Sequence, residues 1–114
     1  MHIGIYINNE NIADVNCKNL LLGNPGIGGT EYCILLLAQV YKMYYSNNKV
    51  TLFVANQGNL PEVDNYVIVN DIDDLPERAK EEGIDILVVS AVYNGMPLPQ
   101  SFFNHIDENN FVGT

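Results

Sequence analysis

The segment Asn24-Pro25-Gly26-Ile27-Gly28-Gly29-Thr30-Glu31 stands between an N-terminal strand-like stretch and a long apolar run. Glycines let the backbone reach positive φ and let a ligand approach without meeting a β-carbon. A helix that begins here offers unpaired N–H groups and about half a positive charge to an anion. We therefore expect a turn that joins a strand to a helix and approaches a phosphate-bearing or sugar ligand. The alternative is that its glycines only shape a tight turn.

The residues on both sides of this turn predict a strand and a buried helix. His2–Ile7 alternates as a strand does, and residues 9–29 form a long loop with one buried anchor at Leu20–Leu22. The helix over Thr30–Tyr45 has its polar residues in one narrow stripe, so we expect it to be buried on most of its circumference. Thr30 is the expected N-cap, and Cys33 is expected in the core.

The rest of the chain continues the alternation of strands and helices. Strands are predicted over Val50–Ala55, Tyr66–Val69 and Ile84–Ser90. Before the last of these, a helix is predicted from the capping residue Asp74 to Gly83. The remaining chain is predicted to form a loop over Asn94–Pro99, a helix over Gln100–Asp107 and the beginning of a strand at Phe111–Thr114. The order β-α-β-β-α-β predicts an α/β fold, namely a Rossmann-like, doubly wound, mainly parallel sheet flanked by helices. Residues 1–114 are expected to be one domain, and the late strand suggests a fragment of a longer, two-domain protein.

The acidic composition disfavours nucleic acid and anionic lipid surfaces as partners. Five basic and fourteen acidic residues give a net charge of −9, which disfavours nucleic acid and anionic lipid. No apolar run approaches the roughly 20 residues of a membrane span, and two cysteines without a secretory leader predict a cytoplasmic protein with reduced thiols. The loop residue Cys17 has no neighbour that would lower its pKa, and neither His2 nor His105 has metal ligands at a recognised spacing, so no metal is expected.

The glycine turn does not fit two common nucleotide motifs. Glu31 occupies the position of the third glycine in a dinucleotide-binding G-x-G-x-x-G pattern, and Ala55-Asn56-Gln57 offers no carboxylate to a ribose hydroxyl. The loop before the glycines is also too long for that motif. A Walker A loop is excluded because the turn has no lysine.

The residues Leu22–Tyr32, followed by an apolar helix and Val50–Val54, resemble the N-terminal domain of family-4 retaining glycosyltransferases, and the resemblance covers roughly the whole chain. It implies a GT-B architecture, in which two Rossmann-like domains face each other across a cleft. The first domain mainly binds the acceptor, and the second mainly binds the nucleotide-sugar donor.

The resemblance carries over residue by residue only to Gly28 and Gly29, near the donor phosphates and the transferred sugar. By proximity, Gly26, Ile27, Thr30 and Glu31 are possible neighbours, and Tyr93 and Asn94 are possible acceptor contacts. No catalytic residue is expected within these 114 residues.

The expected function is thus sugar transfer from a nucleotide sugar to a saccharide or other hydroxyl acceptor, in polysaccharide or glycoconjugate synthesis. The nucleotide sugar is a co-substrate, and no cofactor or metal is implied. A missing C-terminal donor-binding domain is the expected partner, so the chain alone should be inactive. The full-length enzyme is expected in the cytoplasm, where it would be peripheral to the inner face of the membrane if it is associated with the membrane. The alternative is a non-catalytic α/β ligand-binding or interaction module.

Overall fold

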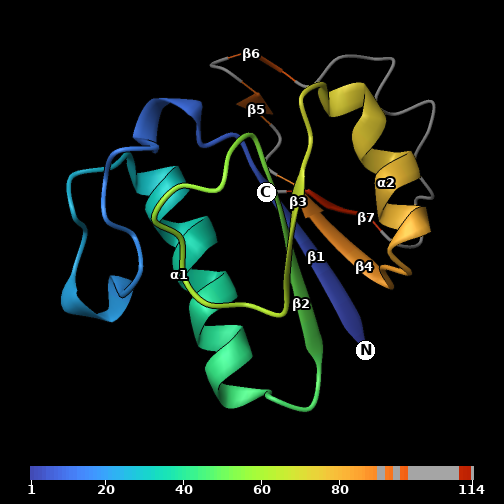
Figure 1. The fold of residues 1–114 in the computed structure, drawn as a ribbon, viewed down its shortest axis with the longest axis horizontal. Helices are drawn as coiled ribbons and strands as arrows, with labels where there is room; N and C mark the ends of the chain where they lie inside the picture. The colour runs from blue at the N-terminus through green and yellow to red at the C-terminus, as the bar shows by residue number, and fades with distance from the viewer. Residues whose placement is uncertain (90–91, 94–95, 98–110, 114) are drawn as a thin grey trace.

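The computed structural model describes residues 1–89, 92–93, 96–97 and 111–113. Its main sheet has five strands in the order β3-β2-β1-β4-β7, and each strand is parallel to its neighbours (Figure 1). The strands are β1 (His2–Ile7), β2 (Lys49–Val54), β3 (Asn65–Ile68), β4 (Ile86–Val89) and β7 (Phe111–Gly113). The chain therefore winds from β1 to one edge and then continues on the other side of β1, which confirms the parallel, doubly wound α/β prediction.

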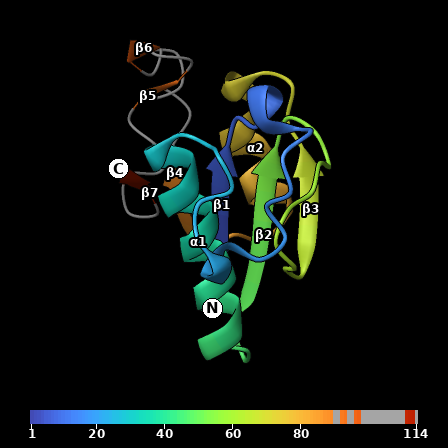
Figure 2. The same ribbon diagram turned by 90° about the vertical axis from the view of Figure 1, so that its left-hand side faces the viewer.

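Two helices cover opposite faces of this sheet (Figure 2). Helix α1 (Gly29–Tyr44) connects β1 to β2, and α2 (Leu75–Glu81) connects β3 to β4. Two short 3-10 helices, η1 (Glu10–Ile12) and η2 (Leu20–Leu22), precede α1, and a third, η3 (Ile72–Asp74), precedes α2. A separate antiparallel pair is formed by β5 (Val92–Tyr93) and β6 (Met96–Pro97).

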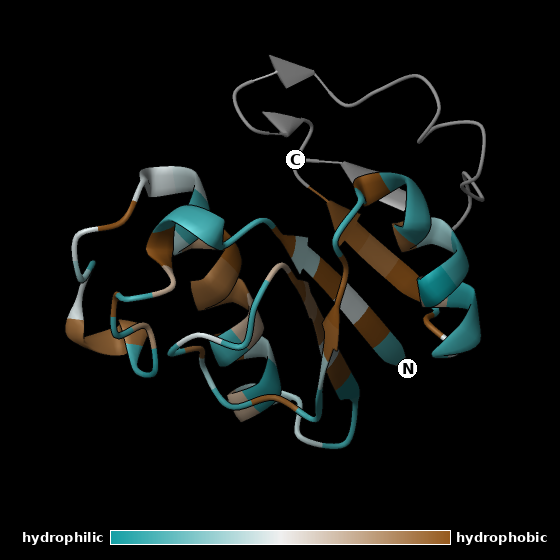
Figure 3. Ribbon diagram, turned by 45° about the horizontal axis from the view of Figure 1, so that its top comes forward, coloured by the Kyte–Doolittle hydropathy of each residue, from teal (hydrophilic) through white to brown (hydrophobic). Residues whose placement is uncertain are grey.

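The core has one layer on each side of the sheet. Alternate residues of β1 and β2, such as Ile5 and Leu52, pack under α1, whereas Tyr6 and Phe53 pack under α2. Hydrophobic residues concentrate along the strands, and α2 shows mostly hydrophilic residues on its outer side (Figure 3). The central strands β1 and β2 are buried on both faces, as expected for parallel strands covered by helices.

The prediction for α1 was wrong in three respects. The helix begins at Gly29 with Gly28 as its N-cap, so Thr30 lies inside the first turn. Its described buried residues are confined to Ile34, Leu35 and Ala38, because only one side of the helix lies against the sheet. Cys33 lies on the opposite side and is exposed.

The polar residues of α1 that were expected in one stripe, among them Gln39 and Lys42, contact two loops. Gln39 Oε1 accepts a hydrogen bond from the Leu20 N–H at 2.8 Å, and Lys42 Nζ lies 2.7 Å from Asp64 Oδ1. These partners lie in the loops that follow β1 and β2. The polar side chains therefore serve tertiary contacts, and apolar side chains face solvent instead.

The remaining predictions met different outcomes. The four predicted strands of the first 90 residues are present with ends shifted by one or two residues, the helix before Gly83 is confirmed, and the strand expected at Phe111 is β7. The predicted loop after residue 93 instead includes β6. The helix expected over Gln100–Asp107 lies outside the described residues. In the described part of the chain, no helix has the length and apolarity that crossing a membrane requires.

Candidate functional site at the carboxyl edge of the sheet

The glycine turn lies at the carboxyl edge of the sheet, where the strands end and α1 begins (Figure 1). Asn24 organises the turn through its side chain. Its Oδ1 accepts hydrogen bonds from the N–H groups of Gly26 at 2.9 Å and Ile27 at 2.8 Å, and its Nδ2 donates to the Ile27 carbonyl at 2.9 Å. Gly26 has a φ of 108°, which glycine adopts without strain. The buried side chain of Ile27 anchors the turn in the core.

The residues that follow are open to solvent. Gly28, Gly29 and Thr30 are exposed, and the Tyr32 N–H donates the first helical hydrogen bond to the Gly28 carbonyl at 2.9 Å. Within the described residues, the N–H groups from Gly28 to Glu31 have no protein acceptor. The positive end of the α1 dipole and four N–H groups without a described partner therefore lie together where the helix begins.

The two central glycines differ in their surroundings. A β-carbon on Gly28 would collide with the Glu31 carboxylate, whose flexible side chain folds back over the turn. A β-carbon on Gly29 would meet no described residue within 4 Å. Gly29 also lacks a positive φ, so neither backbone strain nor packing within the described chain requires a glycine there.

Comparison of the chain with protein-family models, curated proteins and solved structures finds no match. The family resemblance of the glycine turn therefore remains an expectation.

Sequence reasoning missed an asparagine pair that closes the neighbouring part of this edge. Asn9 follows β1 and is only 1% exposed. Its Oδ1 accepts hydrogen bonds from the N–H groups of Ala55 at 2.9 Å and Asn56 at 3.1 Å, directly after β2. Its Nδ2 donates to the Asn56 carbonyl at 2.9 Å, and Asn56 Nδ2 donates back to the Asn9 carbonyl at 3.3 Å. The available signal was an asparagine after each of two strands that end at the same edge.

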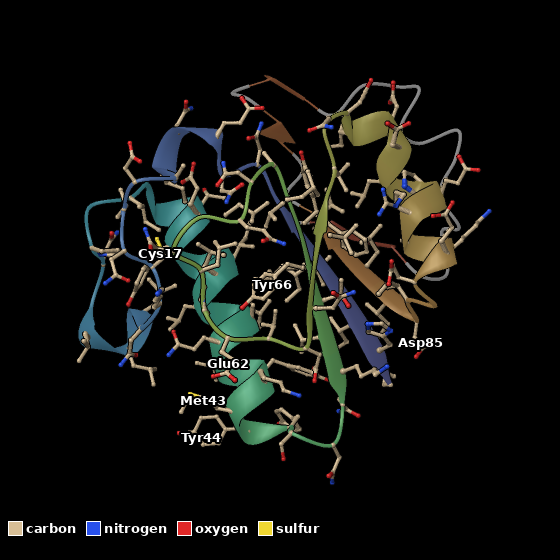
Figure 4. All side chains as sticks on the ribbon, in the orientation of Figure 1. Cys17, Met43, Tyr44, Glu62, Tyr66 and Asp85 are labelled. Atoms are coloured by element: carbon tan, nitrogen blue, oxygen red, sulfur yellow. The ribbon has the colours of Figure 1, made fainter. Side chains whose placement is uncertain are left out.

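The asparagine pair belongs to a longer contact between the two loops. A β-carbon on Gly58 would lie 2.9 Å from the Ala13 carbonyl oxygen, so glycine permits this close approach. The Cys17 N–H donates to the Asn59 carbonyl at 2.7 Å, which holds Cys17 beside α1, where burial raises the pKa of its thiol (Figure 4). In a dinucleotide-binding fold the end of the second strand contacts a ribose. Here that position is filled by Asn9.

The charges near the edge are acidic. None of the five basic residues lies between 23 and 31 or among residues 8–13, 55–60 and 69–74, which follow β1, β2 and β3. Glu31 lies in the first turn of α1. A phosphate bound here would be met by backbone N–H groups and the helix dipole rather than by side-chain cations.

The remaining site predictions concern Tyr93, Asn94 and metal binding. Tyr93 lies in β5, and Asn94 lies outside the described residues. The expected contact of these two residues with an acceptor stays a prediction. Among the described His, Cys, Asp and Glu residues, no group of three or more gathers closely enough to hold a metal ion.

Proposed function

We propose that this chain is the acceptor-side domain of a retaining glycosyltransferase that uses a nucleotide sugar and has a GT-B architecture. The proposal begins from the position of the glycine turn, because open α/β sheets bind ligands outside the carboxyl ends of their strands. The turn combines exposed glycines with N–H groups that have no acceptor among the described residues, at the start of a 16-residue helix.

The observation on which the proposal depends is the open space around Gly29. Because the described chain gives no internal reason for a glycine at this position, the close approach of an external group is the simplest account of it. Gly28 adds a constraint of a different kind, since Glu31 folds over it and would have to move before a ligand reached the turn.

The neighbouring structure favours a sugar donor over a dinucleotide. Asn9 occupies the end of β2, where a dinucleotide would need its ribose contact. The absence of basic side chains from the turn also fits a domain that supplies only part of the phosphate site. In the proposed enzyme, most of the charge that stabilises the diphosphate leaving group comes from the second domain.

The contribution of this chain to the reaction would be preorganisation. Retaining sugar transfer develops negative charge on a leaving diphosphate and positive charge on the sugar ring. Fixed N–H groups at Gly28 and Gly29 would donate to the developing negative charge without reorganisation, which is the general advantage of oxyanion-type sites. The Glu31 carboxylate would accept hydrogen bonds from sugar hydroxyl groups once displaced from Gly28.

A titration of the isotopically labelled chain with uncharged trisaccharides and with UDP-glucose tests the ligand class. We expect amide shifts at Gly28–Glu31 with weak, about millimolar, affinity. Shifts confined to other parts of the chain would contradict the proposed site.

The gene supplies an independent test. The proposal requires a second Rossmann-like domain with donor-binding carboxylates to be encoded after Thr114. If the reading frame contains no such domain, the transferase proposal fails even where saccharide binding is observed.

A non-catalytic interaction module is the second candidate. The observation that favours it is the exposed apolar face of α1, which no feature of the proposed transferase site uses.

A further inference from the structure

The start of α1 is not held by a capping side chain. Gly28 is the N-cap, in an extended conformation and without a side-chain hydrogen bond, and Thr30 lies inside the first turn of the helix. In most helices a Ser, Thr, Asp or Asn at the N-cap binds the first turn and fixes its backbone. In this chain the backbone that leads into Gly28 must be fixed by another part of the glycine turn.

Asn24 fixes that backbone. Its Oδ1 accepts hydrogen bonds from the N–H groups of Gly26 at 2.9 Å and Ile27 at 2.8 Å, and its Nδ2 donates to the Ile27 carbonyl at 2.9 Å. The assignment of the two amide atoms follows from these partners, because the reverse orientation would place the NH₂ group against two N–H donors. One side chain therefore binds both backbone groups of Ile27, the residue directly before Gly28.

The other residues of the turn restrict the same backbone. A proline has φ restricted to about −65°, which applies to Pro25. Gly26 follows it with a φ of 108°, and a proline before a glycine of positive φ is the pattern of a type II turn. The Ile27 side chain is 8% exposed and packs in the core. Asn24 and the core thus hold Ile27 from two sides, so the N–H groups that follow it are fixed in direction.

We propose that Asn24 is a positioning residue of the site at the glycine turn, and that it holds the turn in the conformation in which the N–H groups of Gly28 and Gly29 meet a ligand. The inference rests on the proposed function, because it concerns the same N–H groups. Asn24 acts through Gly26 and Ile27 and does not itself touch the ligand. Its contribution is preorganisation, which spares binding the cost of ordering the turn.

The exposure of Asn24 decides what this role predicts. Asn24 is exposed, whereas Asn9 is buried. Hydrogen bonds at an exposed side chain compete with water and contribute little to the free energy of unfolding. Local order depends on them nevertheless, because a surface turn opens separately from the core. Removing the Asn24 amide should therefore weaken ligand binding much more than it destabilises the fold, whereas a merely structural asparagine would leave binding by the folded chain unchanged.

Asn24→Ala and Asn16→Ala form a matched pair of variants. Asn16 is exposed in the same long loop, and its Oδ1 accepts a hydrogen bond from the Lys18 N–H at 3.1 Å. It lies before η2 rather than in the glycine turn. We expect Asn24→Ala to speed amide exchange at Gly26 and Ile27 by about tenfold or more, because both N–H groups lose their acceptor. Asn16→Ala should leave these two rates unchanged, and both variants should keep the urea midpoint of the original chain.

Binding is measured by titrating the isotopically labelled chain with maltotriose and with UDP-glucose while following the amide shifts at Gly28–Glu31. Asn24→Ala should weaken binding by about fivefold or more, since only molecules with an ordered turn bind. Asn24→Asp keeps oxygen acceptors for both N–H groups and loses only the donation to the Ile27 carbonyl. It should therefore recover part of the affinity for uncharged maltotriose. Asn16→Ala should bind both probes as the original chain does.

The possible results separate this inference from the proposed function. Equal affinities of Asn24→Ala and the original chain would overturn the positioning role of Asn24 and leave the proposed function standing. Weaker binding that Asn16→Ala shares, or that a lower urea midpoint fully explains, would overturn that role as well. If the original chain shows no amide shifts at Gly28–Glu31 with either probe, both the positioning role and the proposed function fail.

Discussion

The side chain of Asn9 spans the gap between the ends of β1 and β2 and holds the backbone of Asn56 through both its oxygen and its nitrogen. Four hydrogen bonds of 2.9–3.2 Å join this amide to Ala55 and Asn56. Since Asn9 is almost completely buried, water cannot replace these bonds without rearrangement of the loops.

We expect Asn9→Ala to destabilise the chain by about 2–4 kcal/mol, because it removes a buried side chain and leaves the partly buried N–H groups of Ala55 and Asn56 without their acceptor. Urea unfolding followed by circular dichroism measures the change. Asn11→Ala is the matched control, since Asn11 is exposed in η1 and should change stability by less than about 0.5 kcal/mol. Equal effects of the two substitutions would show that the asparagine pair does not stabilise the loops.

The ion pair between Lys42 and Asp64 predicts a pH dependence of stability. Burial alone raises the pKa of Asp64, but the hydrogen bonds from Lys42 Nζ and the Val50 N–H and the charges of Lys42 and Lys49 outweigh it, so the pKa lies below its ordinary value. A carboxyl whose pKa is lower in the folded state stabilises that state above the unfolded pKa of about 3.9. This stability is lost as the pH falls through the lower, folded value.

Asp64→Asn should therefore cost about 1 kcal/mol at pH 7, since the pair is partly exposed, and much less in strong acid. Denaturant unfolding of both proteins at neutral pH and near pH 2 measures the difference. A constant difference across this range would mean that the Asp64 charge has no net effect on stability.

The two cysteines should react very differently with thiol reagents. Cys33 is exposed on α1, whereas Cys17 is 1% exposed and burial raises the pKa of its thiol. Because the thiolate is the reactive form, the native chain should show one fast thiol and the unfolded chain two. Cys33→Ser should remove the fast phase. A fast phase that survives this substitution would show that Cys17 is accessible.

Most strands were predictable because they are short apolar runs bounded by polar residues or glycine, and His2–Ile7 was predictable from its alternation. Val50–Val54 and Ile86–Val89 are buried on both faces of the sheet or nearly so, and this environment demands side chains of one kind. The parallel, doubly wound sheet followed from the alternation of strands and helices along the chain.

The orientation of α1 was not predictable from its pattern. When most of a helix is apolar, periodicity identifies the polar stripe but not the side that faces the sheet. Gln39 and Lys42 belong to the predicted polar stripe, yet their side chains bind Leu20 and Asp64, which lie 19 and 22 residues away in loops. The Asn9–Asn56 pair was also missed, because its hydrogen bonds depend on how two loops meet in three dimensions.

The turn itself was located correctly, but its N-cap was not. Thr30 has the side chain that caps prefer, whereas the structure uses Gly28 in an extended conformation without a side-chain hydrogen bond. The Asn24 side chain holds the preceding turn and so determines where the helix begins.

The most direct test of the proposed function compares Gly29→Val with Ser46→Val, an exposed position beyond the other end of α1. Because a β-carbon at Gly29 meets no described residue within 4 Å, and Ser46 is exposed, both substitutions should change the free energy of unfolding by less than about 1 kcal/mol. We predict that Gly29→Val nevertheless abolishes the ligand-induced amide shifts at the turn, and reduces turnover of the full-length transferase at least a hundredfold, while Ser46→Val preserves both. Unchanged ligand binding and turnover in Gly29→Val, or a loss fully explained by unfolding, would contradict the account.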